Sequence, residues 1–169
     1  MQVVRNILLL LLVLPLLVVL LMPKKELYYL LEQKLEKQNI VISGENLQEG
    51  LLGLTVEHPT FYLGGAPVAT AKEISLWSVL FYTQADFDDL RIAEGLPTAF
   101  EVQRLRAVHS VLSPFKINVS GESSLGTLHG EVQLKARMVH IQIAKDGDPK
   151  AMARYLKKHK EGWVYESKF

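Results

Sequence analysis

Five histidines and one cluster of carboxylates are the side chains in this sequence whose types could support metal binding or acid–base chemistry. The histidines are His58, His109, His129, His140 and His159. Their spacing matches no zinc-ligand pattern, and the chain contains no cysteine that could complete one. We interpret these residues as surface or core histidines, and we expect no metal site and no cofactor.

The carboxylate cluster consists of Asp86, Asp88 and Asp89 around Phe87. A calcium site would require more oxygen ligands and a glycine-bent loop, so we interpret this cluster as a solvated turn. The sequence also lacks a G-x-S-x-G elbow, an H-E-x-x-H helix and a phosphate-binding loop. These observations predict a protein that is not an enzyme.

The amino-terminal sequence is almost wholly apolar, and it must position everything that follows. Residues 7–22 are interrupted only by Pro15, and Val3 and Val4 extend the run past Arg5 to 20 residues. A membrane-spanning helix needs about 20 apolar residues, and an arginine near its end can reach the headgroups. We therefore predict a transmembrane anchor over residues 1–23.

A cleaved signal peptide is the alternative interpretation of this segment. It would require a small-residue cleavage site, which residues 21–25 (LMPKK) do not provide.

The orientation of the predicted anchor in the membrane is a separate question. Lys24, Lys25, Lys34 and Lys37 outnumber Arg5, and a count of basic residues would place the large domain in the cytoplasm.

Residues 24–38 predict an amphipathic helix that continues from the anchor. Leu27, Tyr28, Leu31 and Leu35 recur at steps of three and four residues, which is the spacing of one helix face. We expect this face to lie against the domain that follows.

From residue 39 to residue 146 the hydrophobic period changes to two, which predicts an antiparallel β domain. Alternation is clearest over residues 131–138 and slips near Met138, where we expect a bulge or a tight turn. The apolar positions of this segment form a candidate face for lipid or a partner: Val132, Leu134, Ala136 and Met138. Further strands are predicted at 39–44, 51–57, 60–63, 68–77, 87–92, 100–111 and 115–119.

Residues 147–169 predict a basic helix and an aromatic tail. Asp148 and Pro149 form a favourable helix start, the helix continues to Lys160, and Gly162 ends it. Residues 163–165 could then form a terminal strand or pack back onto the body. Candidate contacts to anionic lipid or an acidic partner are Lys150, Arg154, Lys157 and Lys158. A solvated helix face is the alternative.

Charge is distributed unevenly along the chain. Residues 39–149 contain eight basic and thirteen acidic side chains, whereas residues 150–169 contain six basic and two acidic ones. The net charge of +1 nevertheless argues against nucleic-acid binding.

The segment from Ser120 to Leu134 has the pattern S-G-x-x-x-L-G-x-L-x-G-x-V-x-L. It resembles the recurring unit of AsmA-like proteins and of the general secretion pathway protein N family. In those families an anchor leads to a helix and then to a long curved sheet in the periplasm. Residues 27–37, 40–54 and 66–76 resemble the helix, the first hairpin and the next strand. The expected fold class is α+β, mainly β, with a transmembrane helix, an amphipathic helix, a curved antiparallel sheet and a short C-terminal helix.

The resemblance implies a non-enzymatic protein of the inner membrane, with a single span and its large domain in the periplasm. Its partners would be the lipid bilayer and either subunits of a type II secretion apparatus or lipid acyl chains. An LptC-like bridge component of lipopolysaccharide export is the alternative, although that type lacks the helix after the anchor. An anchored enzyme is a third class, for which the sequence offers no cluster of reactive residues.

Overall fold

The computed structural model describes residues 23–79, 81–92, 101–144, 156–159 and 162–168. Within these ranges the chain forms one helix and thirteen strands. No described helix has the length and apolar character needed to cross a membrane, and the anchor predicted over residues 1–23 lies almost entirely outside the described ranges. The bounds are α2 Lys24–Glu36, β1 Ile40–Ser43, β2 Asn46–Glu49, β3 Gly53–Glu57, β4 Thr60–Leu63, β5 Ala66–Thr70, β6 Glu73–Val79, β7 Tyr82–Ile92, β8 Glu101–Ser110, β9 Lys116–Ser123, β10 Gly126–Gln133, β11 Met138–Ala144, β12 Leu156–His159 and β13 Gly162–Lys168.

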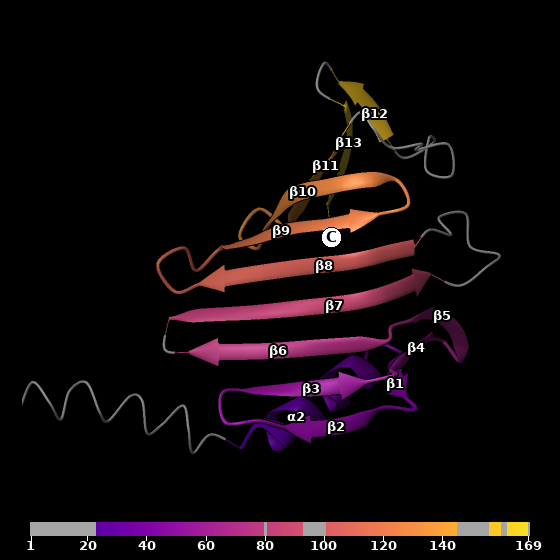
Figure 1. Cartoon of the computed structure of the whole chain (residues 1–169), viewed down its shortest axis with the longest axis vertical. Coiled ribbons are helices and arrows are strands. Elements are labelled where there is room, and N and C mark those ends of the chain that lie inside the picture. The colour runs from indigo at the N-terminus through magenta and orange to yellow at the C-terminus, as the bar shows by residue number, and fades with distance from the viewer. Residues whose placement is uncertain (1–22, 80, 93–100, 145–155, 160–161, 169) are drawn as a thin grey trace, which may run out of the picture.

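All thirteen strands belong to one open antiparallel sheet (Figure 1). From β7 the sheet continues through β8, β9, β10, β11, β13 and β12. On its other side β7 has two neighbours, because β6 pairs with residues 82–88 and β5 pairs with residues 91–92. Asp89 lies between these two regions with a φ of 50°, so the backbone of β7 changes course where it passes from one neighbour to the other.

Two apolar clusters stabilise the sheet. The first lies under α2, and Val56 at its centre is 1% exposed. The second lies between β8 and β13, where Val102 and Leu125 are both 2% exposed. Leu90 packs against both clusters and joins them. Burial of apolar area is the main stabilising contribution in such clusters, and α2 is held on the sheet by it.

The predicted architecture is confirmed in outline, because the described chain is mainly β with one short helix and an open antiparallel sheet. The helix predicted over residues 24–38 spans Lys24–Glu36. The single strand predicted over residues 68–77 is wrong, since the chain turns at Ala71 and Lys72 and forms β5 and β6. The turn is stabilised by tertiary hydrogen bonds, in which Ala71 N donates to Pro59 O and Lys72 N donates to Asp88 O.

The strand predicted over residues 131–138 is also wrong. β10 ends at Gln133, residues 134–137 form a tight turn, and β11 begins at Met138. Arg137 has a φ of 51°, and Leu134 N donates to Phe115 O at 2.9 Å. Apolar and polar residues alternate through this turn as they would in a strand, so the period alone does not reveal it. The turn expected near Met138 is found immediately before that residue.

The C-terminal helix is contradicted where the structure describes it. Residues 156–159 form β12, which pairs with β13. Leu156 is buried in the second apolar cluster, and this tertiary packing outweighs the local helix signal. Gly162 is not a helix end: with a φ of 145° it begins β13, opposite Ala144. The start predicted at Asp148 and Pro149 lies outside the described residues, and the terminal strand is confirmed.

Candidate functional site

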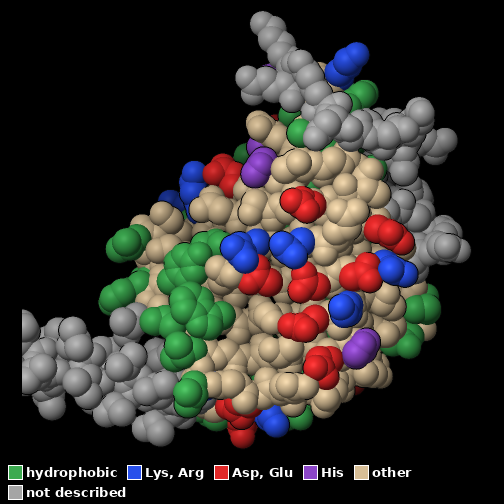
Figure 2. Space-filling model, viewed as in Figure 1, with side chains coloured by type: hydrophobic (Ala, Val, Ile, Leu, Met, Phe, Trp, Pro, Cys, Tyr) green, Lys and Arg blue, Asp and Glu red, His purple; other side chains and the backbone are tan. Residues whose placement is uncertain are grey.

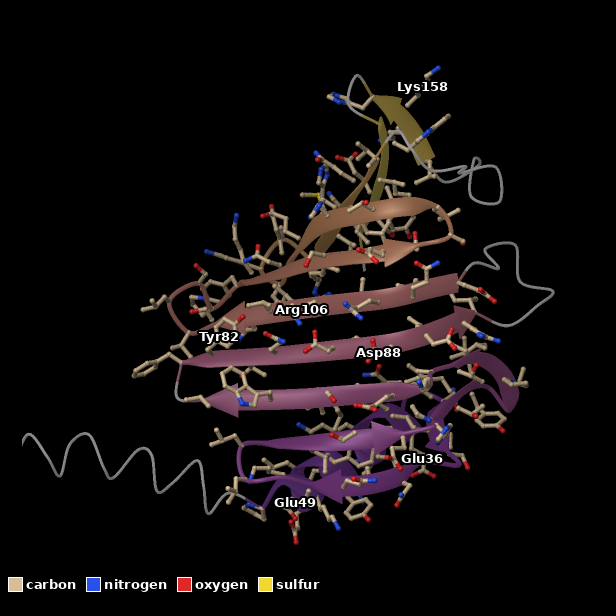
Figure 3. The ribbon with its side chains drawn as sticks, viewed as in Figure 1. Glu36, Glu49, Tyr82, Asp88, Arg106 and Lys158 are labelled. Atoms are coloured by element: carbon tan, nitrogen blue, oxygen red, sulfur yellow. The ribbon has the colours of Figure 1, made fainter. Side chains whose placement is uncertain are left out.

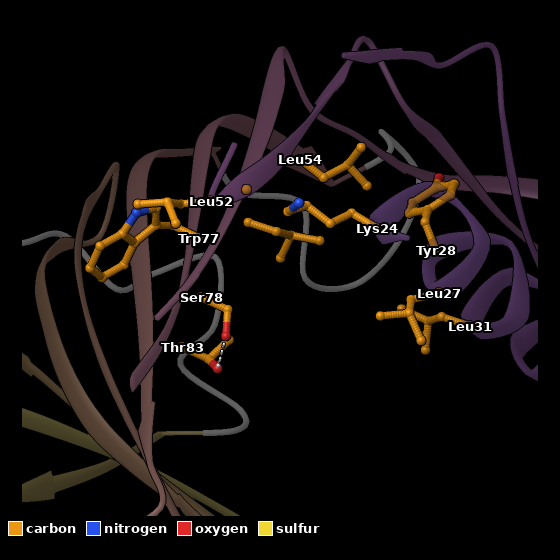
Figure 4. Close-up of a pocket in the computed structure, with 11 residues that line it drawn as sticks. Lys24, Leu27, Tyr28, Leu31, Leu52, Leu54, Trp77, Ser78 and Thr83 are labelled. Carbon is orange, nitrogen blue, oxygen red and sulfur yellow. Dashed lines mark hydrogen bonds between the residues drawn. The ribbon is translucent and has the colours of Figure 1, made fainter. Parts of the chain in front are cut away.

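An apolar pocket lies between α2 and the adjoining ends of β3 and β6 (Figure 4). Its volume is about 300 Å³, which is at the lower end of the range for small-molecule sites. The lining residues are Lys24, Leu27, Tyr28, Leu31, Leu52, Gly53, Leu54, Leu76, Trp77, Ser78 and Thr83.

One face of α2 forms the helical wall of this pocket. Leu27, Tyr28 and Leu31 lie on the same side of the helix because of their spacing. Tyr28 is buried in the first apolar cluster, whereas Leu27 and Leu31 are 41% and 48% exposed. Their exposure follows from the pocket, since these two leucines border the open space and do not reach the core.

The sheet forms the opposite wall, and Gly53 allows its strands to approach there. A Cβ atom at Gly53 would lie 2.3 Å from the carbonyl oxygen of Leu76 on β6. The side chains of Leu52, Leu54 and Trp77 contribute the apolar surface on this side. Trp77 also packs edge-on against Tyr82, with ring centroids 5.7 Å apart.

Three polar side chains that line the pocket, those of Lys24, Ser78 and Thr83, have polar partners. Lys24 Nζ lies 4.0 Å from Glu49 Oε1, and the stem of this lysine runs along the pocket wall (Figure 4). Ser78 Oγ and Thr83 Oγ1 are hydrogen-bonded to each other at 3.1 Å. Burial, together with the nearby carboxylates of Glu45 and Glu32, raises the pKa of Tyr28 above its usual range. The Tyr28 hydroxyl is buried and makes no hydrogen bond in the described part of the chain.

The walls of this pocket suit an apolar group. No histidine lines the pocket, and the hydroxyls of Ser78 and Thr83 are hydrogen-bonded to each other and not to a basic side chain that could activate them. In the described part of the chain, no group of three or more His, Asp or Glu side chains could hold a metal ion.

The candidate face predicted at Val132, Leu134, Ala136 and Met138 is not one face of one strand. Val132 lies on β10 opposite Val139, and Met138 lies on β11 opposite Gln133. Leu134 and Ala136 belong to the exposed turn between these strands. The structure therefore separates these four residues. On the face that holds Val132, the register instead places Ile117, Val119, Val139 and Ile141.

The candidate basic contacts are also distributed differently. Lys150 and Arg154 lie outside the described residues. Lys157 lies on β12 and its Nζ is 3.2 Å from Glu166 Oε2 on β13. Lys158 Nζ lies 6.0 Å from the centroid of the Trp163 ring, within the range of a cation–π contact. Both lysines thus stabilise the pairing of the last two strands.

The acidic cluster predicted as a turn lies within β7, where its members form ion pairs (Figure 3). Asp86 Oδ1 is 2.6 Å from Arg106 Nε, and Asp88 Oδ1 is 3.7 Å from Arg104 Nε. These arginines lie directly opposite on β8. The carboxylates therefore belong to the charged face of the sheet.

The sequence alone did not reveal the pocket, although two of its signals are visible in retrospect. The spacing of Leu27 and Leu31 indicates one face of a helix, and residues 51–54 form an apolar run. Their meeting with Trp77 depends on the pairing of β3 with β6, which no local pattern specifies.

Comparison with protein-family models, curated proteins and solved structures finds no match for this chain. The pocket and the contacts around it therefore carry the functional argument.

Proposed function

We propose that this chain is a non-enzymatic, membrane-anchored protein of the cell envelope that shields a lipid acyl chain, in the manner expected of AsmA-like proteins. The observation that carries the proposal is the pocket between α2 and the sheet. Leucine, tyrosine and tryptophan side chains dominate its walls, and its polar groups are few: Ser78 bonds to Thr83, and Lys24 lies near Glu49. An acyl chain gains from such a surface because transfer from water to apolar walls is favourable.

The sequence before α2 supports the membrane part of the proposal. Residues 7–22 are apolar apart from Pro15, and Pro23 alone separates them from the first residue of α2. An acyl chain leaving the bilayer would therefore meet the pocket close to the anchor. We propose the inner membrane as the location and the periplasm as the compartment of the sheet. A reporter fused after Phe169 tests this orientation, and activity of a cytoplasmic reporter would refute it.

α2 separates this proposal from the LptC-like alternative. That type has no helix after its anchor, whereas here the helix supplies one wall of the pocket. An accessory role in a type II secretion apparatus stays the other expectation from the resemblance. It predicts cross-links to apparatus subunits and no bound lipid.

Substitution at the helix wall tests the acyl-chain proposal. Leu31→Trp replaces a leucine that lines the pocket with a bulkier aromatic side chain. Leu30→Trp makes the same change at an exposed position of α2 that does not line the pocket. The full chain would be purified in detergent and washed, and bound lipid would be extracted and identified by mass spectrometry. We expect acyl chains with the unmodified protein and with Leu30→Trp, and their loss with Leu31→Trp.

Two results would refute the proposal. One is recovery of no acyl chain from any of the three proteins. The other is equal recovery from all three, which would place the lipid somewhere other than the pocket. Circular dichroism of both variants would show that the sheet is intact.

A further inference from the structure

Four turns at one end of the sheet expose large apolar side chains. They connect β2 to β3, β6 to β7, β8 to β9 and β10 to β11. The exposed side chains, which we term the apolar rim, are Leu51, Phe81, Val111, Leu112, Phe115 and Leu134. Leu112 is 89% exposed and Leu51 is 78% exposed. Turns are ordinarily built from glycine, proline and short polar residues, so this composition calls for a physical reason.

Backbone hydrogen bonds hold these turns side by side. Val111 N donates to Phe81 O, and Leu134 N donates to Phe115 O, both at 2.9 Å. Near the turn between β2 and β3, Ser78 N at the end of β6 donates to Leu52 O at 3.0 Å. Figure 2 shows hydrophobic side chains gathered along this end of the sheet. The rim is therefore one continuous feature of the fold.

The opposite end of the sheet provides an internal comparison. Within the described residues, its turns at Gly64–Gly65 and Ala71–Lys72 carry no large apolar side chain. Leu125, in the turn between β9 and β10, is buried. Leu63 and Val41 are the exposed large apolar side chains among the described residues at that end. Among the described residues, exposed large apolar side chains are thus more numerous at the rim than at the opposite end.

The chain enters the described structure at this same end. The backbone N of Lys24 lies 3.4 Å from Glu49 Oε1, next to the turn that carries Leu51. Lys24 also lines the pocket together with Leu52 and Ser78. The apolar sequence of residues 7–22 is therefore joined to the rim end of the sheet.

Aromatic and basic side chains accompany the rim as a membrane interface requires. Trp77 and Tyr82 contact each other on the two strands that the turn of Phe81 connects, and both are partly exposed. Amphipathic rings favour the headgroup level of a bilayer. Lys135 and Arg137 are exposed in the same turn as Leu134, where they can approach anionic headgroups.

We infer that the apolar rim docks on the lipid bilayer, with the four turns inserted into the interface and the strands standing on the membrane. This inference rests on the proposed membrane anchoring and adds a second, independent point of contact. We choose the bilayer as the binding partner because three neighbouring features interact well with lipid. These features are the apolar residues 7–22, the aromatic rings of Trp77 and Tyr82, and the basic turn that contains Lys135 and Arg137.

A depth-sensitive label tests the inference in the full chain, which contains no native cysteine. Leu112→Cys places a polarity-sensitive fluorophore on the rim. Lys72→Cys places the same fluorophore next to the end of β6 that is opposite the rim. The length of β6 separates this position from the rim by roughly 20 Å. Both proteins would be reconstituted in vesicles of phosphatidylethanolamine and phosphatidylglycerol, with and without nitroxide-labelled lipid. We expect a blue-shifted emission at position 112 that nitroxide lipid quenches, and neither effect at position 72.

Phe81→Glu in the Leu112→Cys protein provides a second test, since it adds a charge to the rim without altering a buried residue. We expect loss of the lipid quenching at position 112 and an unchanged circular dichroism spectrum. Quenching by aqueous iodide at position 112 in the parent protein would overturn the inference. So would a blue-shifted label that nitroxide lipid does not quench, because a second copy or another protein would then cover the rim. Flotation with the vesicles reports the anchoring separately, and failure to float would refute the proposed function instead.

Discussion

At the level of single residues, glycines determine how closely neighbouring strands approach. Gly121 on β9 lies opposite Leu105 on β8, and a Cβ atom there would lie 2.3 Å from the carbonyl oxygen of Arg104. Gly130 on β10 lies opposite Ile141 on β11, and a Cβ atom there would lie 2.3 Å from the carbonyl oxygen of His140. Both glycines belong to the pattern that carries the family resemblance, so that pattern has a steric role in this sheet.

We expect Gly121→Ala to destabilise the fold by about 1–3 kcal/mol, because the added methyl group must displace the backbone of β8. The measurement is chemical unfolding of the purified full chain, followed by circular dichroism. Gly50→Ala is the matched control, since its nearest neighbour to an added Cβ is 3.6 Å away. Equal stability of the two variants would show that the close approach at Gly121 has no energetic weight.

The ion pair between Lys157 and Glu166 gives a prediction about pH. Hydrogen bonds from Lys157 and then from His140 lower the pKa of Glu166 below its usual value. A carboxyl group whose pKa is lowered in the folded state stabilises that state above its unfolded pKa. This contribution is lost as the pH falls through the folded pKa.

Lys157→Gln should therefore raise the pKa of Glu166 towards the ordinary glutamate value. Lys158→Gln should leave it nearly unchanged, because Lys158 faces Trp163 instead. A carboxyl-detected NMR titration of both variants measures the difference. An unchanged Glu166 pKa in the Lys157 variant would contradict the contact between the Lys157 and Glu166 side chains.

At the level of elements, β12 shows how a short segment is fixed by a distant cluster. Leu156 is 8% exposed and packs in the second apolar cluster with Leu128 and Ile143. We expect Leu156→Ala to cost about 2–5 kcal/mol, the usual range for a buried leucine. Unfolding would be followed by Trp163 fluorescence in a Trp77→Phe background. Leu112→Ala serves as the control, and its exposed position predicts a change within about 0.5 kcal/mol.

Elements with a one-sided local pattern could be predicted from the sequence. The helix at Lys24–Glu36 has an apolar stripe and few competing signals, and most strands have a period of two. β2 was not predicted because residues 46–49 (NLQE) contain a single apolar side chain. The helix expected up to Lys160 failed because burial of Leu156 and pairing with β13 depend on contacts that a local pattern does not encode.

The pocket could not be predicted for the same physical reason. Its residues extend from Lys24 to Thr83, and they meet only because α2 packs on β3 while β3 pairs with β6. The apolar residues of the rim are visible in the sequence, but only the register of the hairpins places them at one end of the sheet. The residue types therefore indicate that apolar surfaces exist, but the pairing of the strands and the packing of α2 determine where those surfaces form.

At the level of the whole molecule, the two apolar clusters divide one continuous sheet. The first includes Val56 and lies under α2, while the second includes Leu156 and lies between β8 and β13. Of the described residues that pack against them, Leu90 is the one that both clusters share. Regions with separate buried contacts can open separately, even when a backbone ladder connects them.

We therefore expect a core substitution in one cluster to loosen that half of the sheet selectively. Leu156→Ala should speed amide hydrogen exchange in β11, β12 and β13, and should leave α2, β3 and β6 unchanged. Val56→Ala should give the reverse pattern. Hydrogen exchange of the full chain in detergent, read by mass spectrometry of its peptides, measures both. Equally faster amide exchange throughout the sheet in either variant would mean that β7 and β8 transmit the loss of stability from one cluster to the other. The half that holds the pocket could then not remain folded while the C-terminal half opens.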